Sequence, residues 1–259
     1  MRSKKLYIIL IAIVIVFFVV MFLMFGTTNI LQEQYQATLI VGNHTVWNYR
    51  NKRWNNLILS NNLQQLNWQK YEVYLNNEKF GNYYLWHDDR WYLFDDDHNP
   101  VSMEGDLLAY VANYDLNVKG FSEDDSLDLA AVQNVLYDRN IPLDSLFTNQ
   151  SHVAFDFDSD GVVEDFYLIT NVFAMDFDPD SYFSFVFMVK ENRIYMIYDD
   201  VTSSNSFNGC KPFFTSFLDV NHDHIYEFIL SCGRYSIEEQ VDMLYQFDEG
   251  AFKIVISNQ

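Results

Sequence analysis

The chain lacks the motifs and the basic surface on which many enzymes and nucleic-acid-binding proteins depend. Its 259 residues contain 16 Lys and Arg against 36 Asp and Glu, a net charge of −20. Binding to phosphate backbones needs a basic surface, so we expect no nucleic-acid partner. The sequence has no G-x-S-x-G elbow, H-E-x-x-H pair, P-loop or G-x-G-x-x-G loop. We therefore predict that the protein is not an enzyme.

Glycine, proline and cysteine are also scarce, with nine, four and two copies. Few chain-breaking residues and many aromatic ones (23 Phe, 18 Tyr and 5 Trp) indicate a globular, mainly β chain rather than a disordered one. Cys210 and Cys232 stand at equal distances on either side of Asn221. If a hairpin turns there, the two thiols face each other and form a disulfide in an oxidising compartment. Two unpaired, buried thiols are the alternative.

A long apolar run occurs at the N-terminus. Residues 6–25 are consecutive apolar positions, enough for a helix that crosses a bilayer. The run is too long for a secretory signal, and no small-residue cleavage site follows it. Basic residues within 1–5 place this tail in the cytoplasm. We expect a single-pass, signal-anchored cell-membrane protein that is extracytoplasmic after residue 25, starting with a linker over 26–36.

The next segment, residues 37–120, is predicted to form an aromatic-rich β-meander. Turn signals separate its strand-like runs at Arg50-Asn51, Asn76-Asn77 and Asp88-Asp89. Two tryptophan pairs are expected across its hairpins: Trp47 with Trp54, and Trp86 with Trp91. Packing in the core is one use of these rings. The other is glycan or cell-wall binding, because Leu85–Gly105 resembles a single choline-binding or glucan-binding repeat; exposed, coplanar Trp86 and Tyr92 would favour this use.

One amphipathic helix is predicted over residues 122–140, within a bridging segment at 121–145. Ser122 is placed to cap this helix, acidic residues fill its first turn, and Pro142 marks its end. Its expected apolar stripe consists of Leu129, Val132 and Leu136. We expect it to connect the meander to the C-terminal region.

Two acidic segments dominate the C-terminal region. Phe155–Leu168 and Leu218–Leu230 share the pattern apolar, Asp, x, Asp or Asn, x, Asp, x, Val or Ile, x, Glu, with equivalent positions 63 residues apart. Ca²⁺ takes about six to eight oxygen ligands, and this spacing offers several side-chain oxygens and one backbone carbonyl. The predicted ligands are Asp156, Asp158, Asp160, Val162 and Glu164 in the first segment, and Asp219, Asn221, Asp223, Ile225 and Glu227 in the second.

These segments are not EF-hands, because position twelve holds Tyr167 or Leu230 and strand-like residues follow. The pattern resembles the calcium loops of FG-GAP or VCBS repeats, found in integrin-α-like β-propellers. The resemblance covers about residues 146–259 and implies two blade-like, four-stranded repeats with Ca²⁺ in the loops. Gly161 fits the family pattern, whereas His224 stands where the family usually has Gly. The alternative is a pair of acidic hairpin turns, since Asp and Asn favour turns.

A third acidic run, at residues 176–180, lacks the closing Glu and contains Pro179, so we interpret it as a solvated loop. The sequence thus predicts a mainly β, membrane-anchored, extracytoplasmic calcium-binding protein. We expect it to act as a scaffold or adhesion-like module for a protein or glycan ligand at the cell surface. A glycan-binding protein that uses the tryptophan-rich meander is the alternative, and an exported hydrolase without a recognisable motif is the last one.

Overall fold

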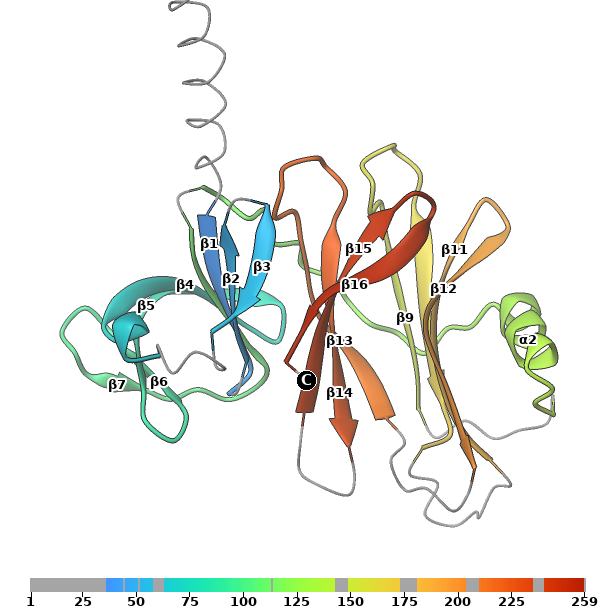
Figure 1. The fold of residues 1–259 in the computed structure, drawn as a ribbon, viewed down its shortest axis with the longest axis horizontal. Helices are drawn as coiled ribbons and strands as arrows, with labels where there is room; N and C mark the ends of the chain where they lie inside the picture. The colour runs from blue at the N-terminus through green and yellow to red at the C-terminus, as the bar shows by residue number, and fades with distance from the viewer. Residues whose placement is uncertain are drawn as a thin grey trace, which may run out of the picture.

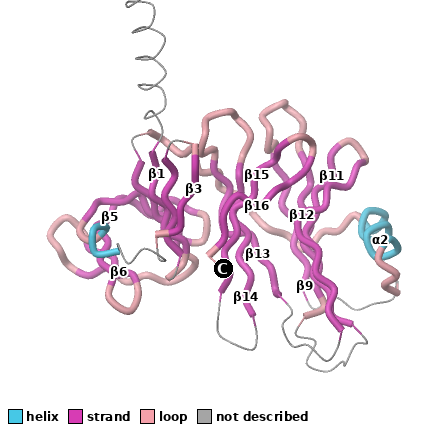
Figure 2. Tube along the Cα trace, in the orientation of Figure 1, coloured by secondary structure: helices cyan, strands magenta, loops and turns pink. Residues whose placement is uncertain are grey.

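The computed structural model describes residues 36–43, 45–50, 52–57, 63–112, 114–142, 149–172, 181–203, 210–234 and 240–258. Their strands form three antiparallel sheets, one of eight strands and two of four, so the protein is mainly β, as predicted. Figures 1 and 2 show the sheets in a row, with the C-terminal sheet in the middle. The predicted membrane helix at 6–25 lies outside the described residues. Within them, no helix is long and apolar enough to cross a membrane.

The N-terminal sheet has the strand order β3-β2-β1-β8-β4-β5-β6-β7. Its strands are β1 (Gln36–Val41), β2 (Thr45–Arg50), β3 (Arg53–Asn56), β4 (Gln69–Leu75), β5 (Glu78–His87), β6 (Trp91–Phe94), β7 (Pro100–Val101) and β8 (Leu107–Ala112), with a short 3-10 helix at Leu63–Leu66. The predicted turns join β2 to β3, β4 to β5, and β5 to β6. The simple meander is wrong, because β8 pairs with both β1 and β4. The apolar residues Leu107–Tyr110 of β8 are buried, as expected for a central strand of the sheet.

The tryptophan pairs agree only in part with the prediction. Trp47 and Trp54 meet edge to face, with ring centroids 6.5 Å apart. The Trp86–Trp91 pair is wrong, because the strand register aligns Trp86 with Tyr92 and leaves Trp91 buried on the other face. Trp86 and Tyr92 are half-buried and their planes lie 43° apart. These two rings therefore do not form the exposed, coplanar platform that the glycan hypothesis required.

The predicted helix forms over a shorter range, as α2 (Leu129–Asp138). Its N-cap is Asp128, whose side chain accepts the first free N–H groups of the helix, and not Ser122. The preceding residues cannot join the helix, because Asp124 pairs with the backbone of His152 through two hydrogen bonds.

The buried face of α2 also differs from the predicted stripe. Val132 and Leu136 are buried as predicted, but Leu129 is exposed and Val135 takes its place. This face packs on the sheet that contains Tyr167 and several phenylalanines. Figure 1 shows α2 at the end of the molecule far from the N-terminal sheet. The helix therefore connects the two regions along the chain but does not bridge them in space.

All eight strands predicted for the C-terminal region form. They are β9 (Asn149–Phe155), β10 (Glu164–Thr170), β11 (Ser181–Lys190) and β12 (Arg193–Ser203), then β13 (Cys210–Leu218), β14 (Glu227–Arg234), β15 (Gln240–Asp248) and β16 (Ala251–Ser257). Within each sheet, strands adjacent in sequence pair with each other. The two sheets share a phenylalanine-rich core that includes Phe166, Phe217 and Phe228. The third acidic run at 176–180 lies outside the described residues.

Cys210 and Cys232 form the predicted disulfide, with their Cα atoms 5.4 Å apart. They are diagonal neighbours rather than directly opposed, because the register aligns Cys232 with Pro212. The hairpin closes at the pair Leu218 and Glu227, so its midpoint falls after His222 and not at Asn221.

Candidate metal-binding loops

The first loop, residues 156–163, joins β9 to β10 and folds around its own acidic side chains. Asp156 accepts hydrogen bonds from the backbone N–H groups of residues 160 and 161, at 3.1 and 3.0 Å. Asp160 accepts one from Val162 at 2.8 Å, and Glu164 accepts one from Phe157 at 3.1 Å. We refer to the three bonds donated by the N–H groups of Phe157, Gly161 and Val162 as the hydrogen-bond frame of the loop. They hold the carboxylates of Asp156 and Glu164 at the inner side of the turn.

The second loop, residues 219–226, joins β13 to β14 and repeats this hydrogen-bond frame. Asp219 accepts the N–H of His224 at 3.3 Å, Asp223 that of Ile225 at 2.9 Å, and Glu227 that of Val220 at 2.9 Å. Each bond lies 63 residues after its counterpart in the first loop. The sequence repeat is therefore also a repeat of local geometry.

His224, which stands in the second loop where the first has Gly161, does not break the loop. Its φ of 67° is left-handed, as is the φ of 87° at Gly161, the equivalent position. Its side chain is exposed. His222, two residues earlier, contacts the segment before α2. Its Nε2 donates a hydrogen bond to the backbone carbonyl of Asp115 at 2.7 Å.

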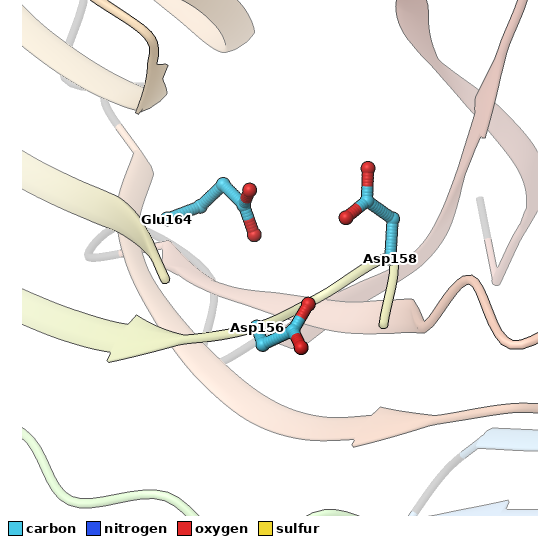
Figure 3. A group of neighbouring side chains, drawn as sticks. All are labelled: Asp156, Asp158 and Glu164. Atoms are coloured by element: carbon cyan, nitrogen blue, oxygen red, sulfur yellow. The ribbon is translucent and has the colours of Figure 1, made fainter. Parts of the chain in front are cut away.

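In the first loop, three predicted ligands come together. One oxygen from each of Asp156, Asp158 and Glu164 lies within 4.8 Å of the others, the one such acidic group found among the described residues. Figure 3 shows the three carboxylates around a common space. Glu164 is fully buried, and the buried Oδ1 of Asp158 accepts no hydrogen bond. Hard oxygen donors with an unpaired buried atom fit a divalent cation such as Ca²⁺.

Lys190, at the end of β11, already supplies a positive charge to this loop. Its Nζ lies 2.6 Å from Asp158, 2.6 Å from Asp160 and 2.9 Å from Glu164. Burial lowers the pKa of Lys190, but the hydrogen bonds to the three carboxylates outweigh it and raise the pKa overall. Burial raises the pKa of Glu164, while Lys190 opposes that rise. The sequence did not identify this lysine as part of the site.

The second loop has no such internal cation. Asp219 and Glu227 are only 1% and 4% exposed, and within the described residues no Lys or Arg forms an ion pair with them or with Asp223. The Oδ1 of Asp219 is buried without a hydrogen-bond donor. Burial raises the pKa of Glu227 to about 8, and the charges of Asp223 and Asp219 add to this rise. Asn221 donates a hydrogen bond to Asp223 at 2.9 Å.

The strand register explains this difference. Lys190 follows Val189, the partner of Asp165 on β10. Gln246 follows Tyr245, which pairs with Phe228, the position of β14 equivalent to Asp165. Gln246 therefore stands in the second sheet where Lys190 stands in the first.

Sequence spacing alone points to the wrong lysine. The residue 63 positions after Lys190 is Lys253, on β16, and its Nζ pairs with Asp248 at 2.6 Å instead of with the loop. A comparison of strand partners, once the strands are known, identifies Gln246.

The second loop also opens on a groove of about 710 Å³. Loop residues and Gln246 line one part of this groove, and the β2–β3 hairpin lines another. The hairpin contributes Tyr49, Trp54 and the cationic Lys52 and Arg53, and the other side includes Asn221, Asp223, Glu227 and Gln246. An ion can therefore reach the carboxylate of Glu227 from solvent.

The side chains of all eight acidic or amide ligands are placed at the two loops, whereas the carbonyl ligands of Val162 and Ile225 stay predictions.

No family model matches the chain, and neither the curated proteins nor the solved structures contain a match.

Proposed function

We propose that the protein is a membrane-anchored, extracytoplasmic scaffold or adhesion-like binding protein whose repeated loops hold Ca²⁺. The observation that supports this most is the hydrogen-bond frame, which occurs twice and closes each time on a nearly inaccessible glutamate, Glu164 or Glu227. A buried carboxylate is costly unless a positive charge is nearby. Acidic turns that merely face solvent have no need to bury this residue.

Calcium would have a structural role in this proposal. It would offset the repulsion among the clustered carboxylates and fix the tips of the β9–β10 and β13–β14 hairpins. Extracellular calcium modules bind with dissociation constants of about 10⁻⁴–10⁻³ M, which suits the outer side of a membrane. The apolar run at 6–25 would be the anchor, and the FG-GAP or VCBS resemblance would make each four-stranded sheet a blade-like repeat. The partner would be a protein or glycan at the cell surface.

Thermal unfolding of the full-length protein in detergent tests this function. At a calcium concentration ten times the dissociation constant, binding to the folded state stabilises it by about 1.4 kcal/mol. For a protein of this size we expect the melting temperature to rise by roughly 3–6 °C relative to chelator. The double variant Asp156→Ala with Asp219→Ala should remove the rise, and the control Asp97→Ala, in an exposed acidic turn far from either loop, should keep it. Equal melting of the wild type in calcium and in chelator would contradict the proposal.

A further inference from the structure

We propose that the two loops hold different cations: the ammonium of Lys190 fills the first loop, and the second loop is the calcium site. This inference rests on the proposed calcium function and narrows it from both loops to the second loop alone. Lys190 and Gln246 occupy the same place in the two sheets. They determine whether a loop holds an ammonium group or a calcium ion.

The first loop is closed to calcium because an ammonium already lies against three of its four carboxylates. The Nζ of Lys190 contacts three carboxylates at 2.6–2.9 Å, and its side chain is only 16% exposed. Charge-assisted hydrogen bonds of this length are the strong ones. A calcium ion on the same oxygens would have to displace the ammonium. Since Lys190 is part of the chain, it competes at a high effective concentration against an ion that binds such modules weakly.

The second loop, in contrast, has buried carboxylates without a lysine beside them. Asp219 is 1% exposed, and its Oδ1 has no donor. Its other oxygen accepts the N–H of His224, which holds the carboxylate inside the loop. Opposite Glu227, the side chain of Gln246 carries no charge. The groove beside Glu227 and Asp223 gives an ion a way in, so a buried oxygen without a partner, an uncharged neighbour and an entry path coincide in this loop.

A reciprocal exchange of the two residues tests the inference. Calcium chloride is titrated calorimetrically into chelator-stripped full-length protein carrying Lys190→Gln, Gln246→Lys or both. We expect one site in the wild type, two in Lys190→Gln, none in Gln246→Lys, and one in the double variant. Each replacement is the residue that the other sheet already has at that place. Far-ultraviolet circular dichroism identifies the variants that are folded.

Two conservative variants locate the wild-type site. Asp219→Asn should weaken calcium binding by about 100-fold or more, and Asp156→Asn should leave it within about twofold. Two sites in the wild type, or loss of its one site in Asp156→Asn alone, would overturn the inference and leave the calcium function standing. Absence of binding in both the wild type and folded Lys190→Gln would instead refute the calcium function. If Lys190→Gln does not fold, Gln246→Lys and the two Asp→Asn variants still decide the assignment.

Discussion

The two loops of this protein have the same hydrogen-bond frame and different electrostatic centres. In both, backbone N–H groups turn carboxylates inward at equivalent positions. In the first, a lysine from the neighbouring strand meets them; in the second, Gln246 stands in its place. The comparison teaches that a loop pattern specifies a backbone shape and a set of oxygens, whereas a residue outside the loop decides which cation they meet.

Removal of Lys190 should give the largest effect. In chelator, Lys190→Met leaves the fully buried Glu164 without its positive partner. Breaking one side of a buried ion pair costs about 3–5 kcal/mol, so we expect the free energy of unfolding in urea to fall by that amount. The matched control is Lys253→Met, which removes a lysine whose ion pairs are exposed and should not change it measurably. Equal losses in the two variants would show that Lys190 is an ordinary surface lysine.

A smaller effect should appear as a dependence on pH that originates in the second loop. Burial raises the pKa of Glu227 from 4.5 to about 8, so the folded state holds this proton more tightly than the unfolded state does. The resulting stability is complete below pH 4.5, declines as the pH rises, and is lost above about pH 8. In chelator, the melting temperature of the wild type should fall across this window.

Glu227→Gln should flatten that decline by a few degrees, because the amide does not titrate. Burial raises the pKa of Glu164 in the same direction, so the measurement that matters is the difference between variant and wild type in a series of melts from pH 4.5 to 8.5. Identical slopes for the two proteins would show that Glu227 titrates normally.

The sequence predicted the local features of the C-terminal region well. The eight strands, the two loops and the cysteine pair follow from alternating apolar residues, acidic turn residues and a repeat of constant length, all of which are properties of neighbouring residues. The hairpin at Asn76-Asn77 is equally local, since both residues have the positive φ that such a turn requires.

Features set by distant contacts were not predictable in the same way. The start of α2 depends on the pairing of Asp124 with His152. The role of Lys190 depends on which residue of β11 lies beside Glu164. Thirteen residues separate Thr170 from its partner Ser184, whereas six separate the equivalent Gly233 from its partner Gln240. This difference breaks the 63-residue spacing, so only the paired strands reveal that Gln246 is the counterpart of Lys190.

The most direct test of which loop binds calcium is a crystal structure of the protein grown with calcium. Anomalous scattering would locate the ion. The account predicts an anomalous peak among the oxygens of Asp219, Asp223 and Glu227, and the ammonium of Lys190 still in contact with Asp158 and Asp160. A peak inside the first loop, with Lys190 turned away from it, would contradict the account.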